Sequence, residues 1–195
     1  MKQSLKQVGR IFLALFLAAI VFGALNWRYF WQNISYMIHK PQQAAQVDVA
    51  EKGEPNKLTI ASIGVDAPVV YVNTKSETAF QEGLKSGVVH YPQTALPGQP
   101  GNVYIFGHSS DYSWSKGQYK TIFALLPRVA IGDIITITDA QGNIFRYKVY
   151  QKQVVTPTDL SVLKQDSSKH ILTLQTSYPV GTALKRYLVL AELIK

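Results

Sequence analysis

HILTLQTSYPVGTALKRYLVL, residues 170–190, is the stretch that decides the fold, and it predicts two β-strands joined by a polar turn. The first strand covers residues 171–176, where Ile, Thr and Gln alternate with Leu, Leu and Thr, as in a strand with two distinct faces. Pro179 and Gly181 end this strand, because proline has no amide to donate and glycine turns freely. The second strand is predicted over residues 185–190.

This hairpin brings two polar groups to its turn end. Ser177 closes the first strand, and Arg186 returns at the start of the second. A hydroxyl on a rigid strand beside a fixed positive charge is an arrangement suited to a nucleophile. From these residues alone, a surface Ser and a solvated Arg remain the alternative interpretation.

Outside the hairpin, the chain from residue 58 onward alternates short apolar strands with turns. Strands are predicted at 58–63, 67–72, 88–91, 102–106, 134–138 and 144–155, and short helices at 77–84, 123–126 and 159–163. Turns that recur every eight to twelve residues predict a mainly β sandwich or barrel.

Three motifs in this region resemble those of the sortases, which are bacterial membrane-anchored cysteine transpeptidases. The motifs are GNVYIFGH at 101–108, TLQTS at 173–177 and RYLV at 186–189. Their order and spacing make the resemblance specific, and it extends from residue 58 to the C-terminus. Within the family, the chain is most similar to the housekeeping-like class D–E type.

The resemblance implies a fold and a set of partners. It selects a closed eight-stranded β-barrel with short helices, formed by residues 58–195 and preceded by one N-terminal transmembrane helix. It implies peptide-bond cleavage at the C-terminal sorting motif of exported proteins, with transfer to water or to an amine acceptor of the cell wall or a pilin. No cofactor is implied.

The resemblance also assigns site residues. His108 corresponds to the catalytic histidine, a general acid for the leaving amine and a base for the incoming nucleophile. Arg186 corresponds to the arginine that binds the substrate carbonyl or oxyanion. Thr176 and His90 are expected to contribute to substrate binding, although His90 is also compatible with a turn residue.

Ser177 departs from the family pattern, because it occupies the position of the nucleophilic cysteine and the chain has no cysteine. A hydroxyl is a far weaker acid than a thiol, so a serine needs a neutral His108 within reach and a third group, for which Asp111 is the nearest candidate. Two interpretations therefore stand: an enzyme with weakened activity, or a catalytically silent sortase fold that binds peptides or scaffolds partners. An engineered change of Cys to Ser is a weaker third.

The N-terminal region predicts a membrane anchor. Residues 11–25 contain no polar side chain, and extension to Trp31 gives a 21-residue span, 11–31, with aromatic residues at its end. The basic residues of segment 1–10 favour a cytoplasmic N-terminus and an extracellular domain in a single-pass plasma-membrane protein. A cleaved signal peptide is the alternative, but no clear A-x-A site follows. Residues 32–57 are predicted to be a polar linker.

Charge and spacing argue against two other classes. The net charge is +8, but five basic and no acidic residues precede position 41, which leaves 15 basic and 12 acidic side chains in the remaining 155 residues. The excess flanks the apolar segment, so nucleic-acid binding is not expected. His90, His108 and His170 are too widely spaced to predict a metal site.

Overall fold

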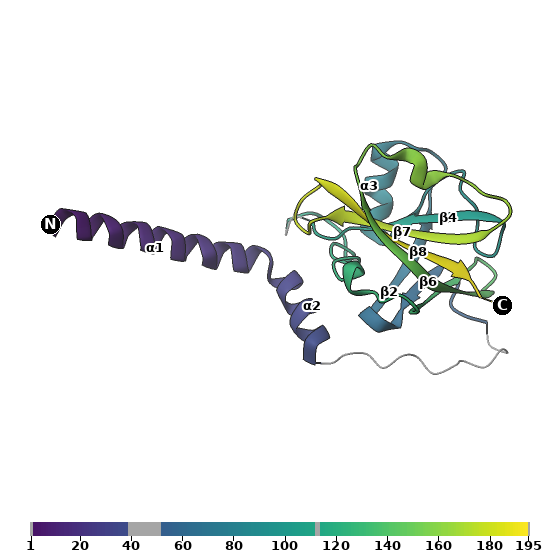
Figure 1. Ribbon diagram of the computed structural model, residues 1–195, viewed down its shortest axis with the longest axis horizontal. Coiled ribbons are helices and arrows are strands. Elements are labelled where there is room, and N and C mark those ends of the chain that lie inside the picture. The colour runs from purple at the N-terminus through teal and green to yellow at the C-terminus, as the bar shows by residue number, and fades with distance from the viewer. Residues whose placement is uncertain (1, 39–51, 112–113, 195) are drawn as a thin grey trace.

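The computed structural model describes residues 2–38, 52–111 and 114–194, which form a β-barrel domain and an N-terminal pair of helices (Figure 1). The strands are β1 (Lys57–Ile60), β2 (Val65–Tyr71), β3 (Val88–His90), β4 (Gly101–Phe106), β5 (Ile134–Thr138), β6 (Ile144–Val155), β7 (His170–Tyr178) and β8 (Lys185–Leu193). The helices are α1 (Lys2–Leu25), α2 (Trp27–Ile38) and α3 (Glu77–Ser86), with short 3-10 helices η1 (Ala61–Ile63), η2 (Leu126–Arg128) and η3 (Leu160–Leu163).

The eight strands close into a barrel in the order β1-β2-β3-β4-β7-β8-β6-β5, and β5 pairs with β1 to complete the ring. Two neighbouring pairs, β2–β3 and β4–β7, are parallel, and the other pairs are antiparallel. The closed eight-stranded barrel and the mainly β class predicted from the sequence are confirmed.

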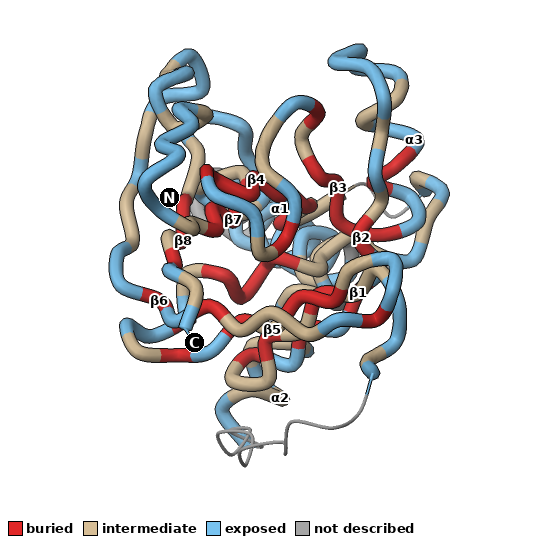
Figure 2. Tube along the Cα trace, turned by 90° about the vertical axis from the view of Figure 1, so that its right-hand side faces the viewer, coloured by how far each residue is buried: buried red, intermediate tan, exposed pale blue. Residues whose placement is uncertain are grey.

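Alternation along β7 separates the barrel interior from its outer surface. Leu172 and Leu174 point inward and are fully buried, and they meet Val103 and Ile105 of the parallel neighbour β4. Figure 2 shows buried segments concentrated in the strands that surround this interior. Burial of each large aliphatic side chain contributes about 1.5–3 kcal/mol relative to exposure, so this interior row fixes the register of β7.

Two further features support the barrel wall. The register of β6 against β8 shifts between Val149 and Gln151, and this bulge lets the 12-residue strand bend around the barrel. Helix α3 begins after Ser76, whose Oγ accepts a hydrogen bond from the Ala79 amide at 3.2 Å. It ends at Gly87, where a Cβ atom would lie 2.2 Å from the Pro68 carbonyl oxygen, so only glycine fits.

The brief helix expected at residues 123–126 is wrong in position. The helical turn is instead η2, which begins at Leu126 and contains Pro127 in its first turn. Proline is favoured at that position because its missing amide has no helical partner to lose. The ends of the other predicted strands and helices lie within three residues of the observed ends; the largest differences are at the predicted strand 58–63, whose last three residues form η1, and at β8, which runs three residues further than predicted.

The apolar segment 11–31, expected as one helix, is divided at Asn26 into α1 and α2. At this point the Asn26 side-chain Nδ2 donates to the Phe22 carbonyl at 2.8 Å, alongside the backbone amide of Asn26 at 3.1 Å. Among the described residues, no single helix has the length and apolar character to cross a membrane. The bent pair 10–24 and 29–38, with 71° between its axes, meets that criterion only when the two parts are taken together.

Part of the predicted linker is helical. Residues 32–38 continue α2, and residues 39–51 lie outside the described part of the chain. The helix continues because one face of it meets the barrel: Arg128 donates to the Asn33 Oδ1 from both Nε (3.2 Å) and Nη2 (3.1 Å). A tertiary contact therefore stabilises helical structure in a segment that the sequence analysis assigned to the linker.

Candidate active site

Strand pairing places Ser177 and Arg186 directly opposite each other. They are register partners in the antiparallel pair β7–β8, so both side chains point to the same face of the sheet. Since Leu172, Leu174 and Thr176 of β7 point inward, Ser177 belongs to the outward row with Thr173 and Gln175. The sequence-predicted juxtaposition of the hydroxyl and the guanidinium is therefore a feature of the fold.

His108 is brought to the same row by the parallel pair β4–β7. Phe106 is the register partner of Gln175, and the Gly107 amide donates to the Gln175 carbonyl at 3.1 Å. β4 ends at Phe106, and His108 follows two residues beyond the last β4–β7 pair. If the same register continues, we expect His108 to lie level with Ser177, next to the Ser177–Arg186 pair of β7 and β8.

Gly107 is required at this point for steric reasons. A Cβ atom there would lie 2.8 Å from the ring of Phe123, which is fully buried. The Phe123 amide in turn donates to the His108 carbonyl at 2.9 Å, so the loop after His108 is packed and bonded back against the strand. The glycine before the histidine therefore lets the barrel interior close directly beneath the site.

The Thr176 side chain lies on the opposite face from the one expected of a substrate-binding residue. It is 2% exposed, and its Oγ1 donates to the Gly107 carbonyl at 2.8 Å. The outward row passes through Gln175 and Ser177, so Thr176 is directed into the barrel. Its hydroxyl joins the two strand ends that carry His108 and Ser177, which makes it a positioning residue in this geometry.

His90 lies apart from the other three predicted residues. It is the register partner of Ile105 and is 4% exposed, and its Nε2 is bonded to the Ala95 carbonyl (2.9 Å) and the Thr94 hydroxyl (3.1 Å). Its ring packs against Tyr71 with 5.0 Å between ring centroids, and burial lowers the pKa of His90. These contacts stabilise the turn after β3. His90 is therefore a turn residue in this structure, which is the alternative given in the sequence analysis.

His170 is also used structurally, since its Nδ1 is bonded to the Gly98 carbonyl at 3.0 Å. Within residues 2–38, 52–111 and 114–194, no three His, Asp or Glu side chains gather as a group that could hold a metal ion.

The two loops beyond the site are linked to each other. The Gly181 amide, between β7 and β8, donates to the Ser110 Oγ at 3.0 Å, two residues after His108. Arg186 Nη1 donates to the carbonyls of Ala183 (3.1 Å) and Lys185 (3.2 Å), so the guanidinium is oriented by its own turn. The peptide bond between Tyr178 and Pro179 is cis, directly after Ser177.

Burial governs the charge state of His108. It lowers the pKa of His108 below the ordinary value of 6.5, and the negative charge of Asp111 offsets only part of this effect. The imidazole is therefore mainly neutral at pH 7. A neutral imidazole can accept a proton from a hydroxyl, whereas stabilisation of a thiolate calls for an imidazolium.

Asp111, the expected third group, is close enough for its charge to act on His108. Its Oδ1 accepts a hydrogen bond from the Ser115 Oγ at 2.9 Å. The nearby aromatic residue Tyr112 lies outside the described residues.

A wall on one side of the site comes from residues that the sequence analysis did not single out. The Gln165 Oε1 accepts from the amides of Ala95 (3.2 Å) and Asn102 (2.9 Å), and the Asn102 Nδ2 donates to the Val162 carbonyl at 3.0 Å. These bonds hold the η3 segment over the outer face of β4. Thr173 beneath it is 2% exposed, whereas Gln175 and Ser177 are half-buried, so the outward row opens towards Ser177.

Asn102 lies in the GNVYIFGH motif, so the sequence contained a signal that it matters. The sequence contained no such signal for Gln165, because this residue lies in a polar loop without periodicity and Ala95 and Asn102, to which it is bonded, are more than sixty residues away in sequence.

Comparison with known proteins agrees with this architecture. The sequence model of the Sortase domain family matches residues 58–194, which is the whole barrel. The chain belongs to the sortase family. Sortase D of Bacillus subtilis (strain 168) is 27% identical over 135 residues, which is 68% of this chain and 60% of that protein. The match therefore spans less than two thirds of the relative's length.

Solved sortase structures have the same fold. The Clostridium perfringens sortase D5 transpeptidase superposes with a TM-score of 0.58 at 28% identity, over 71% of this chain and 78% of that one. Sortase A of Corynebacterium diphtheriae gives a TM-score of 0.60 at 28% identity, over 75% and 63% of the two chains. The similarity to sortase D in both comparisons fits the class D type within the family.

Proposed function

We propose that this sortase-family protein cleaves exported proteins at a C-terminal sorting motif and transfers the new carboxyl end to an amine or to water. The observation that supports this most directly is the outward row of His108, Ser177 and Arg186. The acceptor amine would come from the cell wall or from a pilin, as the family resemblance implies. Replacement of the cysteine by Ser177 sets the rate below that of a thiol enzyme.

The proposed reaction uses each residue of the row. Ser177 Oγ attacks the scissile carbonyl carbon while neutral His108 takes its proton, and Arg186 stabilises the oxygen that becomes negative. The imidazolium of His108 then gives its proton to the departing amine, which leaves an ester on Ser177. An incoming amine or water loses a proton to His108 as it attacks the ester, and His108 returns that proton to the departing Ser177 Oγ, which restores the free hydroxyl.

The slow step is expected to be formation of the ester. A serine hydroxyl cannot be held ionised by one imidazole and one guanidinium, so the proton must move during the attack itself. The lowered pKa of His108 keeps the base in its proton-accepting form, but it also makes that base weaker.

A second candidate function is a catalytically silent sortase fold that binds sorting peptides or scaffolds partner proteins. The absence of any cysteine in the chain favours it, since the family chemistry depends on a thiol. Under this alternative the open end of the outward row still binds a peptide, but no covalent intermediate forms.

We further propose a single-pass plasma-membrane location, with segment 1–10 in the cytoplasm and the barrel outside. The supporting observations are the basic residues before the apolar segment and the sorting substrates, which emerge on the outer side.

Incubation of the full-length protein in detergent micelles with LPxTG-like peptides tests the enzymatic proposal. We expect slow cleavage and, by mass spectrometry, an acyl adduct on the peptide that contains Ser177. Both should disappear in Ser177→Ala, while Ser86→Ala, an exposed serine at the end of α3, serves as the matched control. Peptide binding with neither cleavage nor adduct would contradict the enzymatic proposal and favour the silent fold.

A further inference from the structure

Helix α2 has two chemically different faces. Large apolar side chains recur at three- and four-residue intervals on one face, and they are 39–69% exposed. They are Trp27, Phe30, Trp31, Ile34, Met37 and Ile38. The half-buried residues of the same helix include the polar Gln32 and Asn33 together with Tyr29 and Tyr36. The usual order for a helix on a soluble domain is therefore inverted, because the apolar face points away from the protein.

The barrel contacts the half-buried face through specific bonds. Arg128 of η2 donates twice to the Asn33 Oδ1, at 3.2 and 3.1 Å, and its guanidinium lies 5.3 Å from the centre of the Tyr36 ring. Tyr36 also packs against the buried core of the barrel. These contacts orient α2 by its polar side and leave its apolar side uncovered.

The direction of α2 relative to α1 is also informative. The two helix axes differ by 71° at the Asn26 break, and Figure 1 shows α1 extending away from the barrel while α2 runs across the side that faces α1. The apolar surface of α1, between 51% and 69% exposed from Ile11 to Phe22, continues into the exposed face of α2. The exposed apolar surfaces of two consecutive helices thus meet at 71°.

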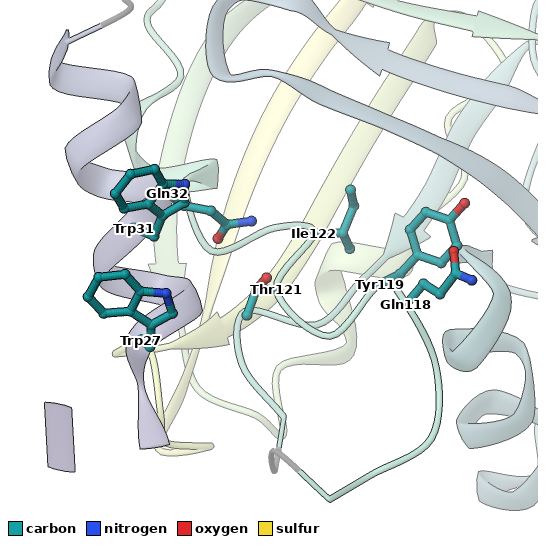
Figure 3. Close-up of a pocket in the computed structure, with 7 residues that line it drawn as sticks. All are labelled: Trp27, Trp31, Gln32, Gln118, Tyr119, Thr121 and Ile122. Carbon is teal, nitrogen blue, oxygen red and sulfur yellow. The ribbon is translucent and has the colours of Figure 1, made fainter. Parts of the chain in front are cut away.

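Tryptophan marks the start of α2. Trp27 and Trp31 stack with 5.7 Å between ring centroids, at the edge of a cleft of about 450 Å³ between α2 and residues 118–122 of the barrel (Figure 3). In Figure 3 the Gln32 amide points from α2 towards Ile122. Tryptophan is enriched where a helix meets the boundary between lipid and water, because its ring is apolar and its N–H is polar.

We propose that α2 lies in the plane of the membrane surface, with its apolar face in the boundary between headgroups and acyl chains and its polar face bound to the barrel. The occupant of the exposed face is thus a lipid bilayer. Continuity with the apolar surface of α1, the 71° turn and the aromatic residues at the turn all favour lipid over a protein partner. The inference rests on the proposed membrane location but not on the proposed catalysis.

This arrangement fixes the orientation of the barrel on the membrane. Helix α2 lies between the bilayer and the barrel, and it faces the loop that follows His108. That loop is tied to the site by the bond from the Phe123 amide to the His108 carbonyl. The candidate active site is therefore held at a set position above the lipid surface instead of moving freely on a tether.

The absence of cysteine makes a direct test possible, because a single introduced cysteine is labelled specifically. Full-length Ile34→Cys and Met37→Cys proteins are spin-labelled and reconstituted into vesicles of phosphatidylcholine and phosphatidylglycerol. The matched control is Leu160→Cys, an exposed leucine (71%) on η3. Collisions of each label with oxygen, which prefers lipid, and with a water-soluble nickel chelate report its depth.

We expect both α2 labels to be protected from the nickel chelate, at a depth of about 5–10 Å below the membrane surface, while the Leu160 label remains in water. Equal nickel accessibility at all three sites would overturn the proposal, as would labels at the bilayer centre. Spin–spin broadening that disappears on dilution with unlabelled protein would instead assign this face to a second copy of the chain.

Separate measurements distinguish a failure of the proposed position of α2 from a failure of the proposed membrane anchor or of the proposed catalysis. Vesicle flotation reports the anchor itself, peptide cleavage reports catalysis, and label depth reports α2. A second variant tests the docking: with labels at positions 34 and 160, Arg128→Ala should broaden the measured distance distribution while the depth of the position-34 label is kept. An unchanged distribution would contradict docking through Arg128, and Arg128→Lys is the charge-matched control.

Discussion

At the residue scale, the proposed site differs from the pattern of the family motifs by one atom. Ser177 replaces sulfur by oxygen, and the neighbouring groups fit that change only in part. Burial keeps His108 neutral, as a serine nucleophile requires, while Arg186 is oriented by carbonyls of its own turn. The chemistry of a single position thus decides how fast an otherwise complete site can react.

The pH dependence of His108 follows from its burial. Because burial lowers the pKa of His108 below 6.5, we expect any base-dependent cleavage to rise with pH and to level off at a lower pH than it would with an ordinary histidine. An NMR titration of the His108 ring measures this pKa without substrate. A midpoint above 6.5 would show that Asp111 outweighs burial and would contradict the neutral base.

The same burial has a consequence for stability. The unfolded chain takes up a proton at the ordinary value of 6.5, whereas His90 and His108 resist protonation in the fold. Stability should therefore fall as pH decreases from about 6.5 towards the lower folded-state pKa values. Urea unfolding across this range measures it, and His90→Gln should make the decrease shallower; an unchanged slope would exclude His90 as a contributor.

Thr176 provides a test of positioning at the same scale. In Thr176→Val the buried Gly107 carbonyl loses its hydroxyl partner, which is expected to cost about 1–3 kcal/mol of unfolding free energy. Thr176→Ser keeps the donor and should lose much less. Urea denaturation of both variants measures the difference, and equal losses would mean that the methyl group matters and the hydrogen bond does not.

At the scale of elements, the wall beside the site depends on the η3 segment. Gln165 is bonded to the backbone of Ala95 and Asn102, and Asn102 is bonded to Val162. This arrangement joins a loop, a strand and a short helix through polar contacts, which the hydrophobic pattern of the sequence does not reveal. It also explains why the outward row is closed near Thr173 and open near Ser177.

Gln165→Ala should therefore loosen this wall specifically. We expect faster hydrogen exchange at the Ala95 and Asn102 amides, since both lose their acceptor, with the barrel interior unchanged. Gln151→Ala, on the exposed side of β6, is the matched control. Exchange rates at Ala95 and Asn102 that match those of the control would show that Gln165 does not hold the segment.

At the scale of the whole molecule, the periodic pattern predicts the strands and a sandwich or barrel, and the resemblance to the sortases selects the closed eight-stranded barrel that is observed. Alternation in β7 and the turn at Pro179 and Gly181 are enough to define the hairpin that carries Ser177 and Arg186. The same alternation predicts that the Thr176 side chain points into the barrel. The resemblance to the family motif led instead to the expectation that Thr176 binds substrate. A family motif predicts where in the chain a site residue lies, whereas the burial pattern predicts which face of the sheet its side chain occupies.

The parts that sequence could not predict depend on contacts between distant segments. The helical part of the expected linker is stabilised by Arg128, 95 positions after Asn33. The break at Asn26 lies in a segment where composition alone favours one continuous helix, although the Asn26 amide and carbonyl both keep their helical bonds, to Phe22 and Phe30. The extension of α2 does have a helical signal in the sequence, because its apolar residues recur at three- and four-residue intervals up to Ile38, but residues 32–38 were assigned to the linker.

The most direct test of the account is the rate of peptide cleavage by Ser177→Cys. If His108 and Arg186 still form a sortase site, the new thiol should be activated and cleavage should rise well over tenfold, where each factor of ten is about 1.4 kcal/mol of barrier. The gain should vanish in the Ser177→Cys, His108→Ala double variant. No gain, together with no alkylation of the thiol near neutral pH, would contradict the account, because the three residues would then not form a working site.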